Sequence, residues 1–200
     1  MDVSMSEFAD FHVLTGSPKV AKVRALKSRG DYEPATDFWR PLRNAITAYH
    51  ARPDGDQRTL RDFLPTVTER RVARYEAAMR GHTRFIRNKS IKGYRAPSGT
   101  WSVGSLRVRV NPEVGLRIGD RRYIAKLYFK ADVLSRARSQ ALIALMEEVL
   151  RPQVPSAVTF AVLDVANADL RTADGRSSIA DTQLALRSEA RAFIEIWEGL

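Results

Sequence analysis

The sequence contains no cysteine. This absence excludes disulfide bonds, a cysteine nucleophile and any metal site built from thiolates. The chain also lacks any apolar run near the roughly 18 residues that a membrane span requires. Its first residues, MDVSMSEFADF, carry acids where a signal peptide needs basic residues. We therefore expect a cytoplasmic protein that makes no membrane contact.

Acidic residues are scarce relative to basic ones. The chain has 33 Lys and Arg against 23 Asp and Glu, which gives a net charge of +10 and an isoelectric point near 10.3. Residues 1–100 hold 19 of the basic residues and 11 of the acidic ones, so most of the surplus lies in the first half. Such a localised surplus favours an anionic partner, with DNA or RNA as the first candidate and an acidic protein as the second.

The periodicity of apolar residues changes near the middle of the chain. Residues 1–88 follow mainly a helical period, whereas residues 100–200 read as strand, strand, helix, strand and helix. The 200 residues, 44% of them hydrophobic, suffice for one buried core, so we expect a single domain over 1–200. The predicted class is α/β (α+β), with N-terminal helices followed by a small mixed sheet and flanking helices.

A basic helix is expected to start near Thr66 or Thr68, the latter a plausible N-cap, and to run toward Ile86. Val72, Tyr75, Met79 and Ile86 fall on one arc of this helix, and arginines gather on the opposite arc. Gly81 is expected to bend or end the helix, and residues 90–100 read as a flexible connector. An arginine face of this kind is also typical of a merely solvated helix.

The basic residues of this helix and of the later strands are the candidates for phosphate contacts, with Tyr94 available to stack on a base. Across residues 70–95, nine basic residues accompany one acid, Glu76. The predicted nucleic-acid-binding residues are Arg70, Arg74, Arg80, Arg84, Arg87, Lys89, Lys92, Arg95, Arg107, Arg109 and Lys130.

A β-hairpin is expected around Gly119-Asp120. If these two residues form the loop, Glu113 lies directly opposite Lys126, and Arg109 directly opposite Lys130. Glu113 and Lys126 would then form a cross-strand ion pair on a solvated face, contributing a few tenths of a kcal/mol. Opposed like charges are unfavourable, so the second pair would indicate a bound anion.

The order of these elements, with Pro112-Glu113 before one strand and Lys126 or Lys130 in the next, resembles the PD-(D/E)XK nuclease-like superfamily. The resemblance implies a restriction-endonuclease-like core in which Glu113 is a catalytic metal ligand and Lys126 positions the water or stabilises developing charge on the phosphate. The family's second acid would fall on Ile124 or Tyr128, which cannot bind a cation. A working metal site would therefore need to recruit another acid, which leaves Glu76, Glu69 and Asp120 as the candidates.

Three functions follow as alternatives. The first is a nucleic-acid-binding protein with an inactive nuclease-like core and no cofactor. The second is a metal-dependent nuclease using Mg²⁺ or Mn²⁺, with Glu113, Glu76 and Lys126 as catalytic residues. The third is an interaction module whose basic face binds an acidic protein in a larger bacterial system.

Overall fold

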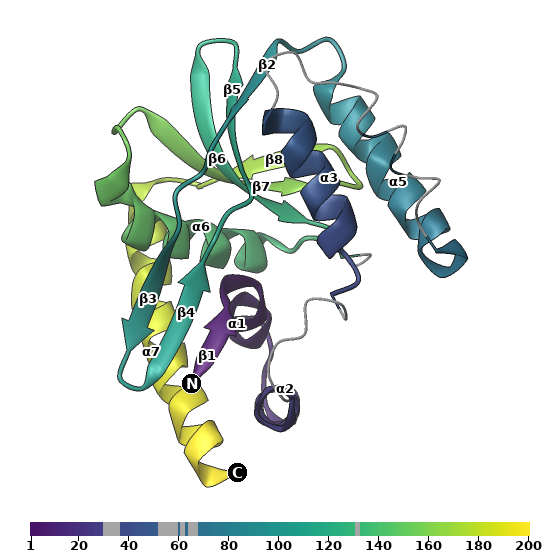
Figure 1. Ribbon diagram of the computed structural model, residues 1–200. Helices are drawn as coiled ribbons and strands as arrows, with labels where there is room; N and C mark the ends of the chain where they lie inside the picture. Colours follow the sequence, from purple (N-terminus) through teal and green to yellow (C-terminus); the bar gives the residue numbers. More distant parts are fainter. Residues whose placement is uncertain (30–36, 52–59, 61–62, 64–67, 131–132) are drawn as a thin grey trace.

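A computed structural model describes residues 1–29, 37–51, 60, 63, 68–130 and 133–200, except the side chains of Arg70, Arg176 and Ser177. The first part of the chain is mainly helical, as predicted (Figure 1). After the short strand β1 (Asp2–Ser4), its helices are α1 (Met5–His12), α2 (Ser17–Ser28), α3 (Arg40–Ala51) and α5 (Glu69–Ile86).

The strands form two sheets, where the sequence predicted a single one. The smaller sheet has the order β1-β4-β3, with β3 at Gly99–Val103 and β4 at Leu106–Val110. The larger sheet has the order β2-β5-β6-β7-β8. Its strands are β2 (Ile91–Tyr94), β5 (Val114–Ile118), β6 (Arg121–Tyr128), β7 (Val158–Asp164) and β8 (Asp169–Thr172).

Helices cover both faces of the larger sheet. The helix α6 (Arg136–Leu150) connects β6 to the parallel strand β7 and packs on one face, and α7 (Arg176–Gly199) packs against α6 and β3. The helices α3 and α5 pack on the other face, where a second hydrophobic cluster forms (Figure 1). The predicted α+β class, with a hairpin, a helix, a strand and a C-terminal helix, is confirmed. Within the described part of the chain, no helix is long and apolar enough to span a bilayer.

The helix α5 continues through Gly81, which was expected to bend or end it. A Cβ built on Gly81 would overlap the backbone carbonyl groups of Val165 and Ala166. The glycine therefore lets α5 approach the turn after β7. Because of this approach, the line of burial runs through Tyr75, Ala78, His82 and Phe85, while the predicted Val72, Met79 and Ile86 are half-buried.

Two histidines join α3 to α5 inside this second cluster. The Nε2 atoms of His50 and His82 lie 2.9 Å apart, and the ring of Tyr49 packs edge-on against both. Burial lowers the pKa of His50 to about 4 and, together with the proximity of His50, that of His82 to about 3. The contact between α3 and α5 therefore holds both imidazole rings in their neutral form.

The segment read as a flexible connector contains the edge strand β2 and the start of β3. Gly93 lies in β2 because α3 packs directly onto it: a Cβ at this position would overlap the backbone of His50. Pairing with β5 brings Lys92 directly beside Arg117 and Tyr94 beside Gly115. One of the Gly and Pro residues that made this segment read as a connector is thus a glycine that is needed for packing.

Candidate nucleic-acid interface

Glu113 lies directly opposite Lys126, as the hairpin register predicted. The β5–β6 ladder pairs Ile118 with Arg121 across the Gly119-Asp120 turn and continues to Val114 and Ala125. The Lys126 Nζ atom donates to Glu113 Oε1 at 2.6 Å, and the backbone N–H of Leu127 donates to Oε2 at 2.7 Å. The carboxylate of Glu113 therefore extends the ladder at the point where β5 begins.

This ion pair is buried, whereas the sequence placed it on a solvated face. The side chains of Lys126 and Glu113 are only 9% and 8% exposed. Arg43 from α3 adds a second cation, with its Nε atom 3.4 Å from Glu113 Oε1, and its NH1 atom donates to Asp37 at 3.0 Å. Asp37, Arg43, Glu113 and Lys126 thus form a chain of alternating charge that is neutral overall.

The residues around Glu113 do not fit the Mg²⁺ or Mn²⁺ that the resemblance implies. Both carboxylate oxygens of Glu113 already accept hydrogen bonds, and a metal ion that bound to this carboxylate would have to displace Lys126. Ile124, at the position of the family's second acid, is buried in the core beside α6. The described residues include no group of three His, Cys, Asp or Glu side chains placed to share a metal ion.

The three acids considered as additional metal ligands are placed elsewhere in the structure. Glu76 is half-exposed on α5 and 3.7 Å from Arg80, one helical turn away. Glu69 is exposed at the start of α5, and Asp120 is fully exposed at the tip of the hairpin, 3.6 Å from Arg117. No contact in the described part of the chain connects any of these three to Glu113.

The basic residues predicted on α5 are exposed where the structure describes them, but several have partners. Arg84 donates to the carbonyl of Ala166 at 2.7 Å, and Arg74 lies over the ring of Phe38. Lys89 donates to Phe85 at 2.6 Å. Arg87 is exposed at the C-terminal end of the helix. The side chain of Arg70 lies outside the described residues.

The predicted opposition of Arg109 and Lys130 is wrong. The strand breaks at Asn111-Pro112, so Arg109 belongs to β4 in the smaller sheet and pairs with Thr100 and Ser4. Lys130 instead forms an ion pair with Asp10. Arg107, also in β4, lies 3.6 Å from Asp2. The argument for a bound anion therefore fails at this place.

The same argument holds at three residues of the larger sheet. Lys92 of β2, Arg117 of β5 and Arg122 of β6 are direct neighbours across the two ladders, and all three are exposed. We call these three residues the cation row. Like charges directly opposite in a sheet are destabilising, so this row of three is a candidate site for a bound anion.

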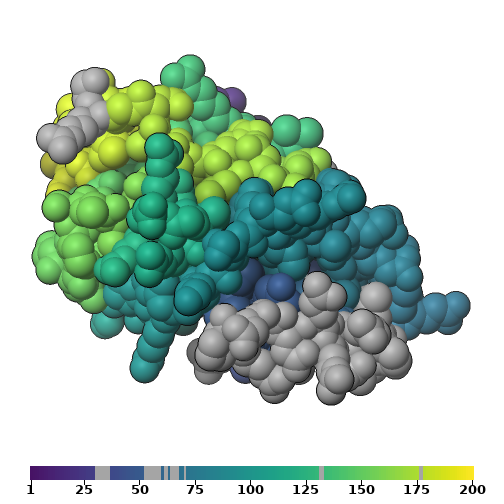
Figure 2. All heavy atoms as spheres, turned by 90° about the horizontal axis from the view of Figure 1, so that it is seen from above, coloured from purple at the N-terminus to yellow at the C-terminus, as the bar shows by residue number. Residues whose placement is uncertain are grey.

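The cation row lies at the end of the molecule where α5 ends and the hairpin turns. The backbone N–H of Gly119 donates to Ser90 at 3.2 Å, which ties the turn to the segment after α5. Figure 2 looks onto this end and shows α5, β2 and the hairpin side by side. Arg87, Lys89 and Arg121 are exposed at this same end of the molecule, with Arg121 on the opposite face of the sheet from the row.

Arg117, Arg121 and Arg122 were missed as candidate site residues. The predicted hairpin register already pairs Arg117 with Arg122, because it is the same register that pairs Glu113 with Lys126. Lys92 could not be added to this pair from the sequence, since β2 was read as a connector. The signal for two of the three cations was therefore present in the sequence.

Tyr94 lies next to the cation row on the same face of the sheet. Its hydroxyl donates to the backbone carbonyl of Tyr123 at 2.8 Å, and its ring rests on Gly115, where a Cβ would come closer than 3.0 Å to three ring atoms. Burial raises the pKa of the Tyr94 hydroxyl, and nearby Arg122 opposes this rise. The ring is therefore held flat on the sheet beside three cations.

Comparison of the chain with protein-family models, with curated protein sequences and with solved structures gave no match.

Proposed function

We propose that the protein binds nucleic acid through the cation row and the basic residues around it. The observation that carries this proposal is the direct cross-strand register of Lys92, Arg117 and Arg122. Three cations held at strand spacing match a chain of phosphates, and the release of counterions from that chain drives binding. Asp120, the acid in the hairpin turn, is fully exposed and 3.6 Å from Arg117, so it offsets little of this charge.

We further propose that the core is nuclease-like and inactive. The position of Glu113 at the start of β5, opposite Lys126 in β6, supports a nuclease-like core. The occupied oxygens of Glu113 support inactivity, since they are bonded to Lys126 and to the N–H of Leu127. In this proposal the two residues stabilise the sheet.

The test is a binding titration with labelled single-stranded and duplex DNA and RNA at two salt concentrations. Wild-type binding is expected to weaken by roughly 0.9 log units per log unit of salt for each phosphate neutralised on duplex DNA. The variant Arg117→Glu/Arg122→Glu is expected to lose most of the affinity. Mg²⁺ and Mn²⁺ are then added to the same samples, and cleavage that Glu113→Ala abolishes would overturn the inactive core.

A matched control is available in the smaller sheet. The variant Arg107→Glu/Arg109→Glu changes the charge by the same amount at two exposed strand arginines, and Figure 1 places β4 away from the β5–β6 turn. This control is expected to bind nearly as well as the wild type. An equal loss in both variants would mean that net charge, and not the cation row, determines binding.

A further inference from the structure

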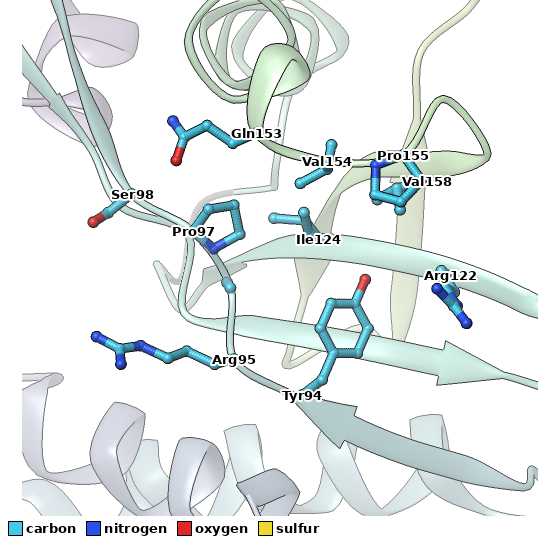
Figure 3. A pocket seen from close by; sticks show the side chains of 11 residues that line it. Tyr94, Arg95, Pro97, Ser98, Arg122, Ile124, Gln153, Val154, Pro155 and Val158 are labelled. Atoms are coloured by element: carbon cyan, nitrogen blue, oxygen red, sulfur yellow. The ribbon is translucent and has the colours of Figure 1, made fainter.

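A pocket of about 480 Å³ opens beside the cation row, between the larger sheet and the segment after α6. Figure 3 shows Tyr94 inside it, with Arg95 and Arg122 on its two sides. Its apolar lining consists of Ala96, Pro97, Ile124, Val154, Pro155 and Val158. The volume and the mixed lining are typical of a site for a small planar group with polar neighbours.

The ring of Tyr94 is a fixed platform in this pocket. One face is covered by Gly115, and the hydroxyl is held by the carbonyl of Tyr123. The side chain still lines the pocket, and the residue is 37% exposed. A planar group could therefore stack on the open side without first ordering the ring, which lowers the entropic cost of binding.

The polar residues of the pocket are cations and neutral groups. Arg95 and Arg122 line it together with Ser98 and Gln153, and no carboxylate is among its lining residues. Within the described chain, neither Arg95 nor Arg122 lies within salt-bridge distance of an acid. Arg122 also belongs to the cation row, so one arginine connects the row to the pocket.

Resting on the proposed function, we propose that this pocket receives an unstacked base of a single-stranded nucleic acid. The base stacks on Tyr94, its phosphates follow the cation row, and Arg95 lies on the far side of the base. A base within a duplex cannot expose its face to Tyr94, because its neighbours in the stack cover it. Stacking is available to every base, so the pocket selects single strands with little sequence preference.

The test compares single-stranded and duplex oligonucleotides that carry one 2-aminopurine, a base whose fluorescence changes on stacking. Wild-type protein is expected to change the emission of the single strand and not that of the duplex. Tyr94→Ala is expected to weaken single-strand binding by about 10- to 100-fold and to leave duplex binding unchanged. Tyr94→Phe keeps the ring and is expected to lose little affinity.

Gly115→Ala provides an independent variant that leaves Tyr94 in the chain. Its methyl group would occupy the space under the ring and displace the platform, so it is expected to weaken single-strand binding as Tyr94→Ala does. Thermal unfolding of each variant checks that the sheet remains folded. The 2-aminopurine signal of the wild-type protein tests stacking without any substitution.

The two proposals fail in different ways. If the wild type binds but Tyr94→Ala retains full single-strand affinity, or loses single-strand and duplex affinity equally, the pocket proposal is overturned and the cation row stands. Unchanged 2-aminopurine emission in the bound single strand overturns it as well. If Arg117→Glu/Arg122→Glu binds as well as the wild type, the proposed function itself is overturned.

Discussion

Replacing Glu113 by alanine is expected to reduce stability strongly. The side chains of Glu113 and Lys126 are 8% and 9% exposed, so their contact is a buried ion pair and not a surface one. Removing one partner of a buried pair costs about 3–5 kcal/mol, because the other charge remains buried without compensation. In Glu113→Ala the N–H of Leu127 also loses its acceptor.

The loss is measured by urea unfolding at neutral pH, with the midpoint compared at an unchanged dependence on denaturant. For a chain of this size, it corresponds to a fall of roughly 10 °C in the thermal midpoint. Replacing both partners, as in Glu113→Leu/Lys126→Met, removes the buried charges together and is expected to cost much less than Glu113→Ala.

Arg107→Met provides the matched control. It breaks the pair with Asp2, whose two side chains are 62% and 54% exposed, and such surface pairs contribute about 1 kcal/mol or less. A loss in Glu113→Ala as small as in this control would refute the buried pair. Unchanged stability together with a loss of Mg²⁺-dependent cleavage would instead favour the nuclease hypothesis.

Three further predictions concern the packing of α5 and the interface. Gly81→Ala should lower the urea midpoint despite the higher helix propensity of alanine, because its methyl group overlaps the backbone of Val165; a gain in stability would contradict the close approach of α5. Stability should fall as the pH drops from 6.5 toward 4, because both His50 and His82 bind protons in the unfolded chain but stay neutral in the folded protein. Each histidine should lower the free energy of unfolding by about 1.4 kcal/mol per pH unit over this range. Urea titrations should show a smaller fall in His50→Gln. The salt dependence of duplex DNA binding should decrease by roughly 1.8 in log–log slope in Arg117→Glu/Arg122→Glu, and an unchanged slope would exclude phosphate contacts by these residues.

The register of the β5–β6 hairpin could be predicted because a short turn signal fixed it. Gly119 has a φ of 58°, a conformation that favours glycine, and the two-residue loop determines every pair back to Val114 and Ala125. The same reasoning failed beyond Pro112. Alternation alone does not say whether Leu106–Val110 continues into the next strand or joins another sheet, and here it pairs with β1 and β3.

Burial around Glu113 could not be predicted either. Pairing across the hairpin gives the partner of Glu113 but not what covers the pair, and the cover includes Arg43, which lies 70 positions earlier in the sequence on α3. The helix break expected at Gly81 and the connector expected over residues 90–100 were wrong for a related reason. Both were read from local propensity, whereas Gly81 and Gly93 are required by the backbone of elements distant in sequence.

The contrast between the two charged clusters of the larger sheet favours one of them as the proposed anion site. Around Glu113, two cations are matched by two acids, so the chain from Asp37 to Lys126 presents little net charge to a ligand. The cation row has three cations at strand spacing, with the exposed Asp120 near one of them. Within the row, only Arg117 has partners among the described residues, Asp120 and the carbonyl of Gly119, so an anion from outside would relieve the remaining repulsion, whereas the ions around Glu113 already neutralise one another. A phosphate chain should therefore bind at the hairpin end of the sheet, away from the position where the resemblance to nucleases would place the reaction.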